Sequence, residues 1–279
     1  LRIKVHFFLG IHKNAKLPKL TRETFYKWSK HNNQYISNKK ALLFIDTFTN
    51  YFDPRIGKAA VKLINSLGYE VEIAEQQFCC GRPAISKGQL NLAKELAEHT
   101  VKELQIYSEK NTSIIFLEPS CFSAIQDDYK SLIDMNQHEG IIKNSMLFEE
   151  FIIKHEQSHP GSLKSILNLN NDSVAIHPHC HQKALGKGSL TAELLKSALD
   201  INAYQIESTC CGMAGSFGIE KEHYEISKNI AELGLINQIN QLNNTKTILT
   251  TGTSCRQQIL QHANIQSMHL AEYLSKKIK

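Results

Sequence analysis

Long hydrophobic runs are missing from this sequence, and so is any strong excess of charge. No apolar stretch approaches the roughly 18 residues that a transmembrane helix requires, so a membrane-spanning protein is not expected. The 32 basic residues exceed the 27 acidic ones only slightly, and the lysines are scattered, which does not favour a nucleic-acid partner. A secretory signal is not expected either, because residues 1–5 lack a long apolar region and a small-residue cleavage site.

The chain also lacks an initiator methionine, and its first 40 residues are polar and irregular. We therefore expect the C-terminal part of a longer protein, with residues 1–40 forming a linker or arm that packs on a neighbouring domain. We expect a cytoplasmic location, with peripheral attachment to the inner membrane as the alternative. In the cytosol, clustered cysteines are more often metal ligands or redox groups than structural disulfides, and this chain has seven cysteines.

From residue 41 onward, short apolar segments alternate with helical patterns. Strands are predicted at 41–45, 69–73, 113–117, 174–176, 203–206 and 247–250, the first as an apolar run buried on both faces and the second with alternating polar and apolar residues. Helices are predicted between them, including a long one at 89–107 that Ser86 and Gln89 would open as a capping box. Residues 134–170 are predicted to be less regular. The alternation of strand and helix implies parallel pairing with right-handed crossovers.

The cysteines repeat along the chain at a near-constant offset. Cys79-Cys80-Gly81 matches Cys210-Cys211-Gly212, and Pro119-Ser120-Cys121 matches Thr253-Ser254-Cys255. We predict an α/β protein of two pseudo-symmetric halves, each a small, mostly parallel sheet with flanking helices. The expected boundaries are 41–157 for the first half, 158–170 for a connector and 171–279 for the second half.

Every cysteine falls near the predicted carboxyl end of a strand, where ligands gather in parallel α/β proteins. In the second half, three strand ends should bring four thiols together: Cys180, Cys210, Cys211 and Cys255. Four thiolates can hold an iron–sulfur cluster or a zinc ion. Adjacent cysteines favour the cluster, because each thiolate can then reach a different iron. Gly81 and Gly212 would let the backbone approach such a cofactor closely and adopt positive φ.

The first half lacks one member of the set. It has Cys79, Cys80 and Cys121, but Thr47 stands where the repeat places the counterpart of Cys180. Either this half binds no metal, or it borrows a ligand from a histidine, from Asp46 or from a partner domain. No residue is predicted to be catalytic.

Three histidines flank Cys180. If the segment is extended, His177, His179 and His181 lie on one face, opposite Cys180. They are interpreted either as ligands or a proton relay, or as hydrogen-bonded neighbours and surface residues. The glycine-rich segment 212–218 has no following Lys-Ser/Thr, so it is interpreted as space for a cofactor or partner rather than as a phosphate-binding loop.

These motifs resemble the cysteine-rich (CCG) domain family. The resemblance covers about residues 41–279 and rests on the two Cys-Cys-Gly sequences, on Glu118-Pro119-Ser120-Cys121, and on the segments 177–185 and 209–218. The family includes the heterodisulfide reductase B subunit, iron–sulfur subunits of glycolate oxidase and of anaerobic glycerol-3-phosphate dehydrogenase, and lactate-utilisation proteins. The chain resembles in particular the C-terminal part of fusions that carry an FAD-linked oxidase domain and a ferredoxin-like [4Fe–4S] segment.

The resemblance implies an electron-transfer role. A flavin upstream in the same polypeptide would oxidise a 2-hydroxy acid such as D-lactate, glycolate or D-2-hydroxyglutarate, and electrons would pass through iron–sulfur centres to a quinone or other acceptor. It also implies cluster ligation by Cys180, Cys210, Cys211 and Cys255, with Cys79, Cys80 and Cys121 as a partial first motif. The family's full motif ends in Cys-x-x-Cys, whereas Ala124 and Gln258 stand at the last position here. The alternatives are a heterodisulfide-reductase-like thiol/disulfide domain and a zinc-stabilised interaction scaffold.

Overall fold

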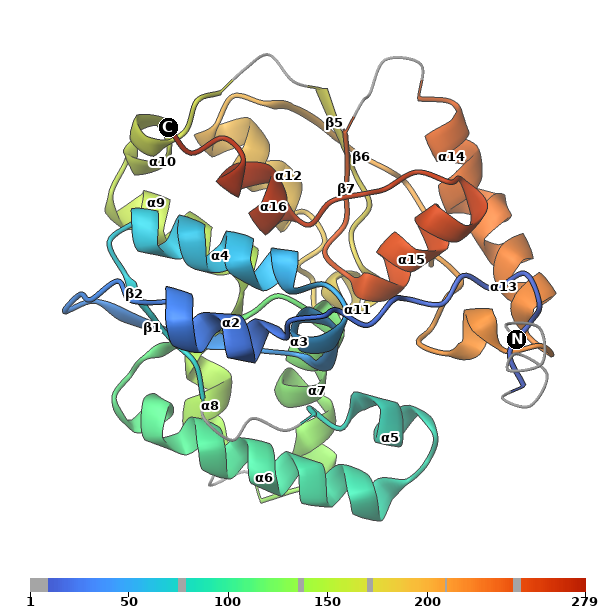
Figure 1. Ribbon diagram of the computed structural model, residues 1–279, viewed down its shortest axis with the longest axis horizontal. Helices are drawn as coiled ribbons and strands as arrows, with labels where there is room; N and C mark the ends of the chain where they lie inside the picture. Colours follow the sequence, from blue (N-terminus) through green and yellow to red (C-terminus); the bar gives the residue numbers. More distant parts are fainter. Residues whose placement is uncertain (1–9, 75–78, 135–137, 170–172, 209, 243–246) are drawn as a thin grey trace. The chain divides into compact units, whose positions relative to one another are not determined.

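The computed structural model describes residues 10–74, 79–134, 138–169, 173–208, 210–242 and 247–279, which divide into two compact units (Figure 1). The N-terminal unit consists of residues 20–169, 197–199 and 271–279. The rest of the described chain, including residues 10–19, forms the C-terminal unit. Each unit is described by itself below.

The N-terminal unit is built on a sheet of four parallel strands in the order β2-β1-β3-β4. The strands are β1 (Lys40–Phe44), β2 (Glu70–Glu72), β3 (Ser113–Phe116) and β4 (Ser145–Leu147). Leu42 pairs with Ile114 at the centre of the sheet, and both side chains are fully buried. The continuous apolar runs in β1 and β3 are therefore explained by helices covering both faces.

The chain moves from β1 outward to β2 and then back across β1 to β3. Right-handed crossovers in opposite directions place their helices on opposite faces of the sheet. Figure 1 accordingly shows α4 and α6 on the two sides of β1 and β2. The helices of this unit are α2 (Phe25–Asn32), α3 (Thr47–Tyr51), α4 (Pro54–Ser66), α5 (Arg82–Ser86), α6 (Leu90–Glu109), α7 (Pro119–Gln126), the 3₁₀ turn η1 (Asp128–Ser131), α8 (Glu139–Asn144), α9 (Phe148–Ser158), α10 (Ser162–Ile166) and α16 (Leu270–Ser275).

The C-terminal unit repeats this arrangement with three parallel strands in the order β6-β5-β7. The strands are β5 (Ser173–Ile176), β6 (Asn202–Gln205) and β7 (Thr247–Leu249). Its helical segments are α11 (Cys180–Ala184), α12 (Leu190–Glu193), η3 (Leu194–Ala198), the 3₁₀ turn η4 (Phe217–Ile219), α13 (Tyr224–Ala231), η5 (Glu232–Ile236), α14 (Asn237–Asn240) and α15 (Thr253–His262). Both η3 and η5 have π-helical hydrogen bonding.

The equivalent strands β1 and β5, β2 and β6, and β3 and β7 occupy the same places in their sheets, which confirms the predicted internal repeat and fold class. The N-terminal unit adds β4 at the edge, beside β3. Residues 10–19 belong to the C-terminal unit: the His12 ring stacks on Tyr224 with ring centroids 3.9 Å apart, and Lys16 Nζ donates to the Leu260 carbonyl.

Two local predictions were wrong. Residues 134–170 were expected to be less regular, but they contain a paired strand, β4, and the three-turn helix α9. Ser86 and Gln89 do not form a capping box, because Ser86 ends the short helix α5 and Gln89 makes no side-chain cap to α6.

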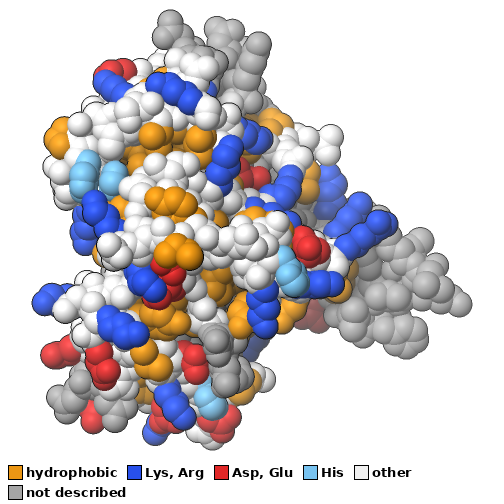
Figure 2. All heavy atoms as spheres, turned by 60° about the vertical axis from the view of Figure 1, so that its left-hand side comes forward, with side chains coloured by type: hydrophobic (Ala, Val, Ile, Leu, Met, Phe, Trp, Pro, Cys, Tyr) orange, Lys and Arg blue, Asp and Glu red, His pale blue; other side chains and the backbone are white. Residues whose placement is uncertain are grey.

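Charge is distributed as the composition suggested. On the face that Figure 2 presents, basic and acidic side chains are interspersed. Among the described residues, no helix combines the length and the apolar character needed to cross a bilayer.

Candidate metal centre

The carboxyl ends of the strands place the cysteines of each unit together. In the C-terminal unit, Cys180 is the first residue of α11, directly after β5, and Cys255 is the third residue of α15, after β7. Cys210 and Cys211 follow β6. The adjoining Thr209 lies outside the described residues.

Contacts between thiols join these four cysteines into one set. Hydrogen bonds link Cys180 to Cys210, Cys210 to Cys211, and Cys211 to Cys255. The Gly212 amide also donates to Cys210 Sγ at 3.3 Å. A single cluster of sulfur donors therefore occupies the end of this sheet, as the repeat predicted.

The hydrogen bonds in this thiol set have opposite effects on neighbouring members. Donation to Cys210 raises the pKa of Cys180, while the hydrogen bond received from Cys180 lowers the pKa of Cys210. The pKa of Cys211 is raised, first by its hydrogen bond to Cys210. The pKa of Cys255 is well below its ordinary value, chiefly because of the hydrogen bond from Cys211. Two of the four sulfurs are thus disposed to be thiolates, the form that binds metal.

Histidines supply part of this effect. The nearby rings of His179 and His177 also lower the pKa of Cys255. His177 Nδ1 lies 2.9 Å from the Ser208 hydroxyl, so the ring has a fixed orientation. His177 Nε2 is buried without a partner of standard hydrogen-bond geometry among the described residues. Such an atom needs a partner, and a sulfur-rich cofactor would provide one.

The expected arrangement of the three histidines was wrong. The extended segment ends at His179, because α11 begins at Cys180, so His181 belongs to a helix. His179 Nδ1 accepts a hydrogen bond from the His181 amide and lies 4.0 Å from Cys180 Sγ, rather than on an opposite face. His177 and His179 are both buried.

Glycines make room for this site. Gly212 has φ +85°, and a Cβ there would collide with the Ser227 carbonyl oxygen. A Cβ at Gly252 would collide with the His179 ring. Gly81, the counterpart of Gly212, also has positive φ, at +78°. Positive φ was expected at Gly81 and Gly212; the role of Gly252 was missed, although it directly precedes the Thr-Ser-Cys motif.

The N-terminal unit has three of the four thiols. Cys80 Sγ lies 3.0 Å from Cys121 Sγ, and Cys79 forms a hydrogen bond with Cys80. Thr47 begins α3 as Cys180 begins α11, and its side chain forms a hydrogen bond with Cys79. The repeat therefore identified the correct position, and a hydroxyl replaces the fourth thiol.

Two buried carboxylates distinguish this unit from its counterpart. Asp46 and Glu118 are the N-caps of α3 and α7, where the C-terminal unit has His179 and Gly252 before α11 and α15. Burial and the charge of Glu118 raise the pKa of Asp46. The sequence contains this difference, since Glu118 directly precedes Pro119-Ser120-Cys121, but the burial of the two carboxylates was not predicted.

The carboxylates change the chemistry of the equivalent cysteine. A hydrogen bond from Cys80 favours the Cys121 thiolate, but burial, Asp46 and Glu118 together raise the pKa of Cys121 to about 11. The pKa values of Cys79 and Cys80 are also raised, first by their hydrogen bonds to Cys80 and Cys121 respectively. The same helix N-terminal position therefore favours thiolate in Cys255 and thiol in Cys121.

Among the described residues, no group of three or more His, Cys, Asp and Glu side chains is arranged ready to hold a metal ion. The case for a metal centre in the C-terminal unit rests on its donors: four sulfurs in one connected set, two of them disposed to be thiolates, beside an unpartnered imidazole nitrogen. This donor set fits an iron–sulfur cluster.

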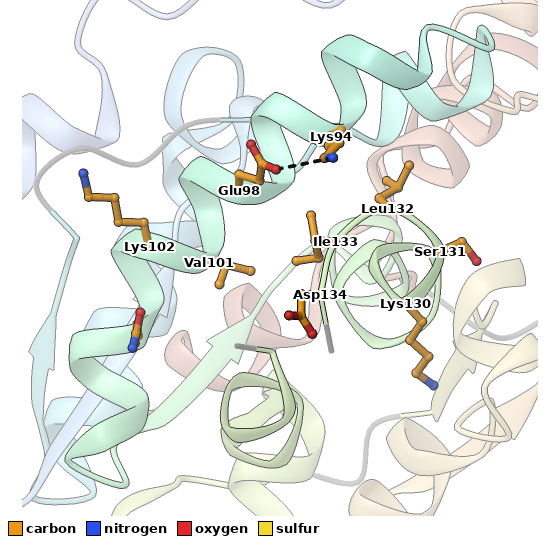
Figure 3. Close-up of a pocket in the computed structure, with 10 residues that line it drawn as sticks. Lys94, Glu98, Val101, Lys102, Lys130, Ser131, Leu132, Ile133 and Asp134 are labelled. Atoms are coloured by element: carbon orange, nitrogen blue, oxygen red, sulfur yellow. Dashed lines mark ion pairs between the residues drawn. The ribbon is translucent and has the colours of Figure 1, made fainter. Parts of the chain in front are cut away.

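A separate groove lies on the N-terminal unit, between α6 and residues 130–134, which include the end of η1 (Figure 3). Its volume is about 650 Å³, and Lys94, Lys102 and Lys130 are among its lining residues. Lys94 Nζ lies 3.9 Å from Glu98 Oε1. No cysteine lines this groove, so it is distinct from both thiol sets.

The fold and the sites define a thiol-rich α/β protein with two related sulfur sets at the ends of parallel strands. The model of the cysteine-rich domain family, CCG, matches residues 46–126 and 174–260, so the chain belongs to that family.

Curated relatives cover most of the chain. It is 27% identical over 265 residues to a subunit of the anaerobic glycerol-3-phosphate dehydrogenase of Escherichia coli K12, an alignment that covers 94% of this chain and 65% of that protein. It is 28% identical over 255 residues to lactate utilization protein A 2 of Bacillus cereus Q1, covering 85% of this chain and 98% of that protein. The chain thus spans just under two thirds of the length of the Escherichia coli relative.

Proposed function

We propose that this chain is the iron–sulfur electron-transfer module of an FAD-dependent 2-hydroxyacid dehydrogenase or oxidase. The observation that supports this most strongly is the connected set of Cys180, Cys210, Cys211 and Cys255 at the strand ends of the C-terminal unit. These four cysteines would hold a cluster of the [4Fe–4S] type. Such a cluster supplies one-electron transfer, which a flavin needs in order to pass electrons to a quinone or another acceptor.

The relatives support the oxidoreductase part of this proposal. One is named as a subunit of a dehydrogenase, and others are named for the utilization of lactate, a 2-hydroxy acid. In the proposed protein, the flavin and a ferredoxin-like segment lie upstream in the same polypeptide. The substrate would be an acid such as D-lactate, glycolate or D-2-hydroxyglutarate.

Residues around the thiols have defined tasks in this account. The His177 ring, oriented by Ser208, lies near Cys255 and lowers the pKa of that thiol. The Gly212 amide provides another to Cys210. Gln258, which takes the last position of the family's Cys-x-x-Cys motif, is fully buried and donates to the Ser227 carbonyl at 3.1 Å. It therefore fixes the backbone beneath Gly212 rather than adding a fifth sulfur.

Metal analysis of the anaerobically purified chain tests the proposal. We expect a brown protein with about four iron atoms and about four acid-labile sulfides per chain, as for a [4Fe–4S] cluster. Zinc in stoichiometric amount, without iron or a redox-active absorption band, would select the scaffold alternative instead. Colourless protein that stays free of iron after chemical reconstitution would reject the electron-transfer role.

A further inference from the structure

The thiol set of the N-terminal unit is suited to a different chemistry from that of the C-terminal unit. We propose that Cys80 and Cys121 form a reversible disulfide, with Cys79 as the thiol through which external disulfides react. The N-terminal unit would then carry a two-electron dithiol centre. This proposal does not depend on the presence of a cluster in the C-terminal unit.

The distance between the two sulfurs is the first argument. Cys80 Sγ and Cys121 Sγ lie 3.0 Å apart, about 1 Å more than the length of an S–S bond. Both side chains are buried, at 3% and 7% exposure. A small movement of the side chains would therefore close the bond without exposing either sulfur.

Both cysteines are held firmly in place by the backbone around them. The hydroxyl of the fully buried Tyr129 donates to the Cys80 carbonyl at 2.9 Å. Cys121 lies in the first turn of α7, and its amide donates to the Glu118 carbonyl at 3.1 Å. The two sulfurs are thus kept facing each other, which favours bond formation between them over reaction with other thiols.

The charges around this set favour an uncharged product. Asp46 and Glu118 are buried at the N-caps of α3 and α7, the two helices that carry Thr47 and Cys121. A cluster requires several thiolates, whereas a disulfide carries no charge, so the carboxylates do not disfavour it. Thr47 also replaces the fourth thiol that the other unit has. The N-terminal unit therefore offers three sulfur ligands instead of four, next to two buried carboxyl groups that the C-terminal unit does not have at these positions.

Cys79 provides the entry point. It is half-buried, whereas Cys80 and Cys121 are buried, and it forms hydrogen bonds with Cys80 and Thr47. An external disulfide can reach Cys79 first, and each later exchange is then between neighbouring sulfurs. Only the thiolate form of each cysteine attacks, so the exchange is expected to be slow at neutral pH and faster at alkaline pH.

The reaction balances with a low-molecular-weight disulfide, RSSR, as the oxidant. Cys79 attacks RSSR, which forms a mixed disulfide and releases one RSH. Cys80 then displaces the second RSH from Cys79, and Cys121 attacks Cys80, which returns Cys79 to the thiol. In sum, two protein thiols lose two electrons and two protons, and one RSSR becomes two RSH. The reverse sequence reduces the external disulfide.

Thiol trapping tests this assignment. The full-length chain, prepared anaerobically, is treated with oxidised glutathione, alkylated and digested with trypsin. Because trypsin does not cleave before Pro83, Cys79 and Cys80 stay in peptide 63–87, and Cys121 lies in peptide 111–130. We expect these two peptides to be joined by a Cys80–Cys121 bond that dithiothreitol reverses. The iron content should not change during the treatment.

Variants separate the three thiols. Cys80→Ser and Cys121→Ser should each abolish the link between the two peptides. Cys79→Ser should still form it, but about tenfold or more slowly with glutathione, because the accessible thiol is gone. Absence of the link at every glutathione ratio would overturn the proposal. So would a metal ion bound in stoichiometric amount by the three thiols and lost in Cys80→Ser, or a link confined to Cys79 and Cys80.

Discussion

Single side chains determine how the two sulfur sets differ. In the repeat, His179 is equivalent to Asp46, and Gly252 is equivalent to Glu118. All four are helix N-caps that precede the helices of the site. A histidine ring near Cys255 favours its thiolate, whereas two carboxylates near Cys121 oppose one. The motif cysteines could be found from sequence, but their charge state could not, because it depends on which N-cap residues are buried next to them.

His177 is predicted to tune the candidate metal centre. In His177→Gln, the buried imidazole nitrogen that would donate to a cluster sulfur is lost, so negative charge on the reduced cluster is less well stabilised. Hydrogen bonds to cluster sulfurs raise the reduction potential, so we expect it to fall by on the order of 50 mV. The measurement is an anaerobic redox titration followed by electron paramagnetic resonance.

Ser208→Ala is the matched control for His177→Gln. It removes only the partner of His177 Nδ1, so the potential should move in the same direction and by less. An unchanged potential in His177→Gln, with full iron content, would show that the ring does not act on the cluster. A purely structural role would lower stability and leave the potential where it was.

At the scale of the elements, the strands were predicted well and the short helices were not. Each predicted strand is present, because short apolar or alternating segments between turn and helix signals are typical of strands in α/β proteins. The five-residue helices α3 and α11 were missed because a single turn carries no periodicity to detect. β4 was missed because its three residues become a strand only by pairing with β3.

The caps of α3 and α7 predict a pH dependence of stability. Burial and the charge of Glu118 raise the pKa of Asp46 in the folded state. The folded protein therefore binds a proton at Asp46 more tightly than the unfolded chain does. The stability that this proton binding contributes is fully present below the pKa of Asp in the unfolded chain, about 3.9. That stability is lost as the pH rises through the higher pKa of Asp46 in the folded state. Glu118→Gln removes the neighbouring charge and keeps an oxygen that can accept from the Ser120 amide.

We therefore expect Glu118→Gln to raise the free energy of unfolding by about 1 kcal/mol at neutral pH and to flatten its decline with pH. Urea unfolding at several pH values between 4 and about 8 measures the free energy of unfolding of both proteins across this pH range. The free energies of wild type and variant should converge at the acidic end. A variant that is less stable than wild type throughout the range would contradict the account of the buried pair.

At the scale of the whole molecule, the two units share one pattern of strands and cysteines. Both sheets have the same order for their three equivalent strands, and the matched family covers both. Sequence alone predicted this architecture because the cysteine motifs repeat at a nearly constant offset. The division of residues 197–199 and 271–279 into the N-terminal unit was not predicted, since it depends on packing between segments distant in sequence.

Removal of the cluster should affect the two units unequally. A ligand that binds only the folded state stabilises the part of the structure that holds it. After chelation of iron, amide hydrogen exchange should therefore accelerate in β5, β7 and α15 by at least about tenfold, and much less in β1 and β3. Equal acceleration in both sheets would indicate that the metal is not confined to the C-terminal unit.

The central claim is that the C-terminal thiols hold an iron–sulfur cluster and the N-terminal thiols do not. Cys255→Ser and Cys121→Ser remove equivalent third residues of α15 and α7, so each controls for the other. The most direct test is the iron and acid-labile sulfide content of both variants after identical anaerobic purification. We predict that Cys121→Ser retains the wild-type content and that Cys255→Ser loses most of it. Equal loss in both variants, or loss only in Cys121→Ser, would contradict the account.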